Sequence, residues 1–268
     1  MRIVMFAGSH PRHLYIADVL SRTGFLAGIV MEKRENMILE IPEGLDSNMK
    51  MLYSRHFELR LEKEEKYFGN VDIESLLVKY PVLELEESEL NSKEVEKFVK
   101  KLEADTLIAY GPGLIKENIL NLCPDRCFNL HGGLSPYYKG AATMFWPFYF
   151  LEPNYVGTTF HHITMKIDGG KIIHQSVPEL EYGDGMHEVA CKAIVAAGND
   201  LLKLIPMLMD TKTVQGVEQR KNGKLFLEKD WRPEHLRIVY ELYGDKIVDL
   251  YLDGVINKNN NPRLIRAW

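Results

Sequence analysis

The sequence predicts an α/β fold: a mostly parallel, Rossmann-like sheet flanked by helices, with a small C-terminal α+β appendage. Residues 2–7 (RIVMFA) form an apolar, β-branched and aromatic run that is typical of a strand buried on both faces. Residues 12–22 follow with apolar side chains at helical spacing, and 25–31 (FLAGIVM) form a second strand-like run. This β-α-β order indicates a parallel, doubly wound sheet.

Later segments continue the alternation. Residues 33–46 read as a loop and 48–69 as a long, charged surface helix. Pro147 either kinks an aromatic helix or marks its first turn, and Asp184 is expected to cap the last long helix. Further helices are predicted within 92–105, 141–151 and 184–208, and further strands at 106–110, 126–130, 156–168 and 171–175, the last two joined by Asp168-Gly169-Gly170.

The pattern changes after about residue 210. Two hairpins are predicted, around Asn222-Gly223 and Asp253-Gly254, with a helix at 232–244 between them. We therefore expect a catalytic domain over 1–209 and the appendage over 210–268.

Composition narrows the functional classes. A net charge of −5 argues against nucleic acid as the main partner. Three cysteines form no disulfide framework, and Cys123 and Cys127 lack a second ligand pair for zinc. No signal peptide and no run of 18 apolar residues is present. These features predict a cytoplasmic protein without membrane insertion, structural metal or disulfide.

Three polar residues mark a candidate site. Asn129 and His131 come at the end of one predicted strand, and Asp168 at the end of another. Open parallel sheets bind ligands at the carboxyl ends of their strands. Asn can donate to an oxyanion, His can act as general base or acid, and Asp can orient the imidazole. The set suits acyl transfer between amines, although each residue alone also fits a hydrogen-bonded core position or a turn.

The quoted motifs resemble the N10-formyltetrahydrofolate-dependent formyltransferase family. The resemblance covers roughly residues 2–205 and is densest over 105–175. It is carried by several separated motifs in the family's order: Asn129-x-His131, Leu134-x-Pro136, Gly140-Ala141, Val156-Gly157-x-Thr159 and Asp168, preceded by the strand and loop within 104–120.

The resemblance implies specific roles. Asn129, His131 and Asp168 would be catalytic, and N10-formyltetrahydrofolate would be the co-substrate. Backbone groups in the loop after the 106–110 strand would hold the pterin. The residues of this loop singled out for cofactor binding are Tyr110, Gly111, Gly113, Leu114 and Ile115.

Among the family's branches, the sequence most resembles the sugar-nucleotide N-formyltransferases, which modify amino-dideoxy sugars for surface polysaccharides such as lipopolysaccharide O-antigen. The loop after the first strand has one glycine, which fits a glycinamide ribonucleotide site poorly. The short tail and acidic charge disfavour initiator tRNA. A nucleotide-linked 4-amino-4,6-dideoxyhexose is therefore the expected acceptor, with a homodimer as the expected assembly. Substrate contacts are expected from His10, Arg12, Tyr138, Lys139 and Trp146.

Other classes stay open at this point. A methionyl-tRNA formyltransferase-like enzyme or another amine formyltransferase would use the same trio. A non-catalytic folate-binding protein or a formate-releasing hydrolase could share the fold. A metallohydrolase would need His131, His161, His162 and Asp168 together, which is disfavoured because adjacent strand residues point to opposite faces.

Overall fold

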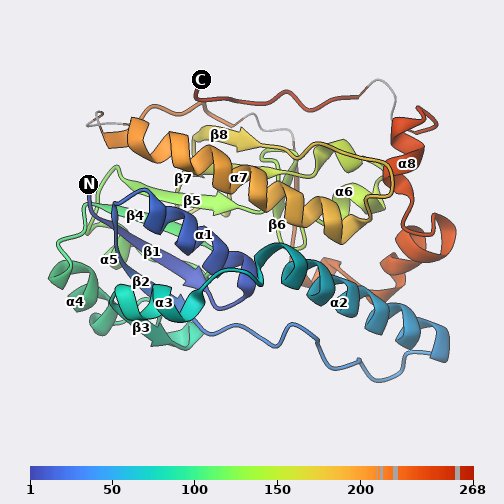
Figure 1. The fold of residues 1–268 in the computed structure, drawn as a ribbon, viewed down its shortest axis with the longest axis horizontal. Helices are drawn as coiled ribbons and strands as arrows, with labels where there is room; N and C mark the ends of the chain where they lie inside the picture. The colour runs from blue at the N-terminus through green and yellow to red at the C-terminus, as the bar shows by residue number, and fades with distance from the viewer. Residues whose placement is uncertain (210, 212–213, 220–222, 257–259) are drawn as a thin grey trace.

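The centre of the molecule is a seven-stranded sheet with the order β3-β2-β1-β4-β5-β7-β8 (Figure 1). This computed structural model describes residues 1–209, 211, 214–219, 223–256 and 260–268. The sheet strands are β1 (Ile3–Gly8), β2 (Leu26–Glu32), β3 (Val82–Leu85), β4 (Thr106–Tyr110), β5 (Cys127–His131), β7 (Thr158–His162) and β8 (Ile172–Ser176). The first five are mutually parallel; β7 pairs antiparallel with both β5 and β8, so β7 alone is reversed and β8 runs in the direction of the first five. The predicted mostly parallel sheet is confirmed.

Helices cover both faces of this sheet (Figure 1). The α-helices are α1 (Pro11–Arg22), α2 (Ser47–Phe68), α3 (Ile73–Lys79), α4 (Lys93–Lys101), α5 (Glu117–Leu120), α6 (Trp146–Tyr149), α7 (Met186–Met209) and α8 (Ile247–Leu252). Apolar side chains of α1, α3 and α7 pack on one face, and those of α4 and α5 pack on the other. Short 3-10 or π turns are η1 (Glu87–Glu89), η2 (Pro153–Tyr155), η3 (Glu228–Asp230), η4 (Pro233–His235) and η5 (Ile238–Leu242).

The predicted surface helix, α2, has one buried face. Asp46 caps its start by accepting the Met49 N–H at 2.8 Å. Tyr53, His56 and Phe57 are buried against residues of α6, α7 and the C-terminal segment. One face of the helix is therefore part of the core that it shares with α6, α7 and the C-terminal segment, whereas its other face is charged.

Several predicted element boundaries were wrong. The aromatic helix shrinks to α6, with Pro147 in its first turn. The strand predicted over 156–168 ends at His162, so Asp168 lies on the connection between β7 and β8 rather than at a strand end. Asp184 does not cap α7. Instead, the Met186 N–H donates to Asp245 at 2.9 Å, and a contact between residues so far apart in sequence leaves no local signal.

The predicted C-terminal hairpins also need correction. Asn222 lies outside the described residues, but the strand that follows it, β9 (Lys224–Phe226), pairs in parallel with β6 (Tyr138–Gly140). Residues around Asp253-Gly254 end helix α8 instead of turning a hairpin: the adjacent Ile247 and Val248 are both buried, which a strand with one solvent-exposed face would not allow. The helix predicted over 232–244 breaks into η4 and η5.

The segment after residue 223 packs closely on the body of the molecule. Leu236, Val239 and Tyr240 share an apolar cluster with Phe145 and Met186. Further along, the Gln175 N–H of β8 donates to the Ile265 carbonyl at 2.9 Å, which covers the edge of the sheet. The domain boundary at residue 210 stays a prediction.

In the part of the chain described above, no helix is both long and apolar enough to cross a lipid bilayer.

The packing of the C-terminal segment can be tested with two leucines. Leu236 is fully buried in the shared cluster, whereas the side chain of Leu242 is 66% exposed. We expect Leu236→Ala to lower the free energy of unfolding by about 2–5 kcal/mol, and Leu242→Ala by at most about 0.5 kcal/mol. Denaturant unfolding of both variants measures this, and equal effects would contradict the shared core.

Candidate active site

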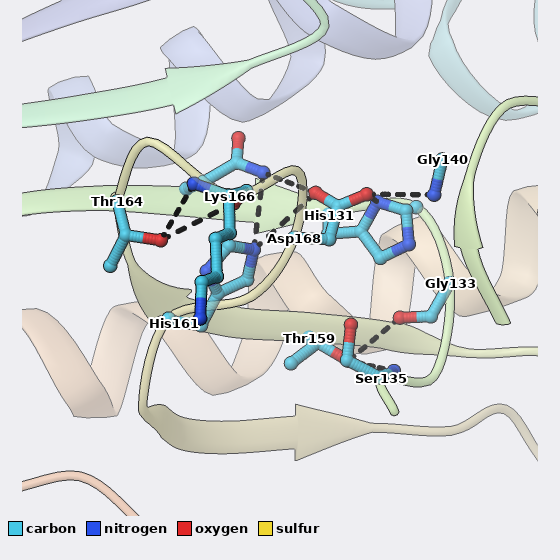
Figure 2. A network of polar contacts seen from close by, with 12 residues as sticks. His131, Gly133, Ser135, Gly140, Thr159, His161, Thr164, Lys166 and Asp168 are labelled. Carbon is cyan, nitrogen blue, oxygen red and sulfur yellow. Dashed lines mark hydrogen bonds and ion pairs between the residues drawn. The ribbon is translucent and has the colours of Figure 1, made fainter. Parts of the chain in front are cut away.

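The carboxylate of Asp168 is the centre of a polar network at the carboxyl end of β5 (Figure 2). Its Oδ2 accepts the Gly140 N–H at 2.8 Å and lies 3.3 Å from His131 Nδ1. Its Oδ1 lies 3.3 Å from Asn129 Nδ2 and 3.6 Å from His161 Nε2. The structure therefore brings the three predicted residues, Asn129, His131 and Asp168, together around one carboxylate.

Strand register accounts for this meeting. Asn129 and His131 are two residues apart in β5 and so face the same side of the sheet. Antiparallel pairing sets Asn129 opposite His161 of β7. The His161 Nδ1–H donates to the His162 carbonyl at 2.8 Å, which leaves Nε2 to accept from the Asn129 amide at 3.3 Å.

The backbone of Asp168 is held in an uncommon conformation. Its φ of 45° lies in the left-handed region, which Asp tolerates better than most residues. Gln219 stabilises it by donating to the carbonyls of Asp168 and Gly170 at 2.6 and 2.8 Å. Gly140 is also required locally: its φ is 86°, and a Cβ there would lie 2.0 Å from the Phe226 carbonyl oxygen.

A hydroxyl clamp fixes the loop after β5. Thr159 accepts the Ser135 N–H at 2.9 Å and donates to the Gly133 carbonyl at 2.7 Å (Figure 2). Thr159 belongs to β7, so the motif threonine ties this loop to the sheet. Gly132, at the start of the loop, lines both cavities described below.

Burial and charge act in opposite directions at the site. Burial lowers the pKa of His131, while the neighbouring Asp168 carboxylate opposes that shift. Burial would raise the pKa of Asp168, but His131, His161 and the Gly140 N–H together lower it to about 2. The His131 Nε2–H donates to the Tyr138 carbonyl at 3.0 Å, so both ring nitrogens face acceptor oxygens. This arrangement can take up and stabilise a proton on the ring.

A cavity of about 530 Å³ opens on this network. It is lined by Asn129, His131 and Asp168 together with all five residues predicted to bind the cofactor: Tyr110, Gly111, Gly113, Leu114 and Ile115. The loop is pinned from outside. The Gly113 N–H donates to Glu32 at 2.7 Å, and the Leu114 carbonyl accepts from Asn91 at 2.9 Å. These two backbone groups already have partners, so other groups of the loop would have to contact a ligand.

A second cavity, of about 400 Å³, adjoins the first and shares Tyr110, Gly132 and Thr143 with it. An ion cluster lines one wall. Glu64 Oε1 lies 2.6 Å from Arg12 and 3.2 Å from Arg60. The other carboxylate oxygen of Glu64 is buried and has no hydrogen-bond partner within the described chain. Phe57, Phe145 and Trp231 add aromatic surface.

The predicted substrate contacts divide between these surroundings. Arg12 lines the second cavity. His10 is buried behind it, between the Glu35 carbonyl and Arg60. Tyr138 is also buried and bonded to Glu152, and Trp146 stacks on Phe226 with 4.5 Å between ring centroids. Among the described residues that line the two cavities, four of the predicted contacts are missing: His10, Tyr138, Lys139 and Trp146. Trp146 is therefore part of the core, because its ring is almost fully buried and packs on Phe226.

Several residues of the site escaped prediction. Glu32 is a charged residue ending an apolar strand, and that signal could have revealed it. Gln219, His56 and Trp231 are ordinary surface-type or aromatic residues in sequence, and only long-range packing brings them here.

The metallohydrolase alternative finds no geometric support. His161 faces Asp168, whereas His162 turns to the Val214 carbonyl at 3.0 Å, so the adjacent histidines diverge as expected. Among the residues that are described, no group of three or more His, Cys, Asp or Glu side chains is arranged to hold a metal.

Comparison with known proteins adds independent evidence. Residues 49–202 match the model of a family described as formyl transferase. A bifunctional polymyxin resistance protein ArnA from Wigglesworthia glossinidia brevipalpis is 31% identical over 150 residues, or 56% of this chain. This chain spans only 22% of the length of that relative.

Solved structures share the fold. A 4-N formyltransferase from Francisella tularensis superposes with a TM-score of 0.55 at 14% identity, covering 86% of this chain and 77% of that one. An N-formyltransferase from Helicobacter canadensis, in complex with folinic acid and dTDP-3-aminofucose, gives 0.54 at 16% identity, covering 100% and 85%.

The lowered pKa of Asp168 predicts a pH-dependent stability. The ordinary carboxyl pKa is 3.8 and the value in the folded protein is about 2, so ionised Asp168 stabilises the fold above about pH 5. That contribution, about 2 kcal/mol, should be lost as the pH falls from 4 towards 2. The difference in unfolding free energy between the wild type and Asp168→Asn should therefore shrink on acidification. The exposed Asp253→Asn is the control, and a pH-independent difference for Asp168→Asn would refute the assignment.

The Glu32 contact with Gly113 can be tested without any ligand. Glu32→Leu keeps similar volume but removes the acceptor of the half-buried Gly113 N–H, and leaving such a donor unpaired costs about 1–3 kcal/mol. We expect the Gly113 amide hydrogen to exchange roughly 10–100 times faster, following that cost. Glu84→Leu, at an exposed position of β3, should leave this rate unchanged. Unaltered exchange in Glu32→Leu would show that the loop is held by other contacts.

Proposed function

This chain belongs to the formyl transferase family, and from that premise we propose that it transfers a formyl group from N10-formyltetrahydrofolate to the amine of a nucleotide-linked amino-dideoxy sugar. A 4-amino-4,6-dideoxyhexose is the proposed sugar. The observation that carries the proposal is the network around Asp168, which joins Asn129 and His131 in the wall of the first cavity, and this cavity adjoins the second.

A folate co-substrate is supported by the larger cavity. Its pinned loop, from Tyr110 to Ile115, offers backbone donors and acceptors, which suit the amide-like edge of a pterin better than charges do. The folinic acid bound to the related Helicobacter protein supports the same assignment. The aminosugar nucleotide in that complex supports a sugar acceptor, and Arg12 and Arg60 supply positive charge for a diphosphate.

The chemistry needs a nucleophile, an oxyanion donor and a proton acceptor. The neutral amine attacks the formyl carbon, the bond from that carbon to N10 breaks, and N10 gains a proton. The Asn129 amide holds the developing oxyanion, which replaces its long 3.3 Å contact with His161. The proton lost by the amine passes to the His131–Asp168 pair. The products are a formamide and tetrahydrofolate.

A homodimer, a cytoplasmic location and a role in lipopolysaccharide O-antigen synthesis stay predictions.

The decisive experiment is an acceptor panel. We expect the protein with N10-formyltetrahydrofolate to add one formyl group, seen by mass, to an amino-dideoxy sugar nucleotide carrying dTDP, GDP or UDP. Turnover of initiator methionyl-tRNA or glycinamide ribonucleotide, with none on sugar nucleotides, would overturn the proposed acceptor. Formate release without any amine would instead indicate a hydrolase.

Site variants test the catalytic assignment. We expect Asn129→Ala and His131→Ala to reduce kcat by at least about 100-fold, since each removes a group that stabilises the transition state. Circular dichroism should show that both remain folded. Asn70→Ala, at an exposed turn, is the matched control and should keep full activity. Near-normal turnover in either site variant would reject the assignment.

A further inference from the structure

His56 lies on the wall of the second cavity, and no sequence motif marks it as a site residue. It belongs to helix α2, is 6% exposed and lines the cavity beside Phe57, Phe145 and Trp231. Its ring centroid is 6.0 Å from that of Trp231. A polar ring set among aromatic walls needs partners, because burying an unpaired polar group is costly.

Two residues from other elements hold one nitrogen of this ring. His56 Nδ1 lies 3.0 Å from the Tyr240 hydroxyl and 3.3 Å from His187 Nε2. Burial raises the pKa of Tyr240, so its hydroxyl keeps its hydrogen. Within the described chain, His56 is the one hydrogen-bond partner of that hydroxyl. Nδ1 therefore accepts the Tyr240 hydrogen, and a neutral ring must then carry its own hydrogen on Nε2.

The ring stays neutral at ordinary pH. Burial and the nearby Arg60 guanidinium lower the pKa of His56 to about 3. Nε2 makes no hydrogen bond to any described residue, and it is not among the fully buried unpaired atoms. His56 thus offers an uncharged N–H donor to whatever occupies the cavity.

We propose that His56 is a specificity-determining residue whose Nε2–H donates a hydrogen bond to an uncharged oxygen of the acceptor sugar, with Tyr240 fixing its tautomer. This inference rests on the proposed function. It assigns the second cavity to the sugar ring itself, and it makes the C-terminal segment, through Tyr240 and Trp231, part of acceptor recognition.

The other walls of the cavity match this class of ligand. A sugar hydroxyl is both a donor and an acceptor, so its oxygen can accept the Nε2–H of His56. Phe57, Phe145 and Trp231 provide apolar faces suited to the C–H face and the methyl group of a 6-deoxy sugar.

The test combines variants of His56 with altered acceptors. The probe is dTDP-4-amino-4,6-dideoxyglucose, together with analogues in which each ring hydroxyl is replaced by hydrogen. We expect His56→Phe to lower kcat/KM by roughly 10–100-fold, mainly through KM, since a recognised polar contact is lost. His56→Gln, which keeps an N–H near the Nε2 position, should restore most of the loss. Folate affinity should be unchanged in both variants.

One analogue should reveal the contact directly. Removing the hydroxyl that faces His56 should lower the kcat/KM of the wild type by a similar factor. The same analogue should cause no further loss of kcat/KM in His56→Phe. Tyr240→Phe should narrow the discrimination between the parent acceptor and that analogue. If His56→Phe fails to fold, His56→Gln and the analogue series on the wild type carry the same comparison.

The outcomes separate the two hypotheses. Activity of His56→Phe within twofold of the wild type, or additive losses for variant and analogue, would overturn the role of His56 and leave the proposed function standing. Failure of the wild type to formylate any sugar nucleotide would overturn the proposed function, and this inference with it.

Discussion

The ionised carboxylate of Asp168 is the constraint on which the site depends. A buried charge is tolerated only when polar partners surround it, and here they come from separate parts of the chain: the Gly140 N–H and the Asn129 amide donate to the carboxylate, and the His131 ring, which becomes a cationic partner when protonated, lies beside it. The left-handed backbone conformation of Asp168 directs its carboxylate towards these groups, and Gln219 stabilises that conformation by donating to the Asp168 carbonyl. The loop from β7 to β8 is therefore shaped by electrostatics, and the geometry of the candidate site follows from pairing one buried charge.

Around this charge the fold arranges two cavities with different chemistry. The first is bounded by the backbone-rich loop after β4, held in shape by Glu32 and Asn91. The second is bounded by aromatic rings and by the Arg12–Glu64–Arg60 cluster. Because they share Tyr110, Gly132 and Thr143, ligands in the two cavities would meet beside Asn129 and His131. Such a layout suits transfer of a small group between two large molecules.

The C-terminal segment contributes to this layout. Asp245 accepts the first N–H of α7, Tyr240 contacts His56, and Phe226 packs on Trp146. Trp231, in the same segment, lines the second cavity. Under the proposed function, the segment therefore contributes to acceptor recognition.

The sequence by itself determined the mostly parallel sheet, the order of its first strands and helices along the chain, and the candidate trio of site residues, because buried strands and polar residues ending them leave local patterns at 2–7, 106–110 and 126–131. It also located the loop from Tyr110 to Ile115. Only the tertiary structure decided that Trp146 is core, that Asp245 rather than Asp184 caps α7, and that Asp253-Gly254 ends a helix. It alone brought Glu32, His56 and Gln219 to the site. The reason is physical. Local sequence patterns report burial and the periodicity of helices and strands. These partners, in contrast, are set by contacts between residues far apart in the chain, and the sequence does not show which distant residues lie close together in space.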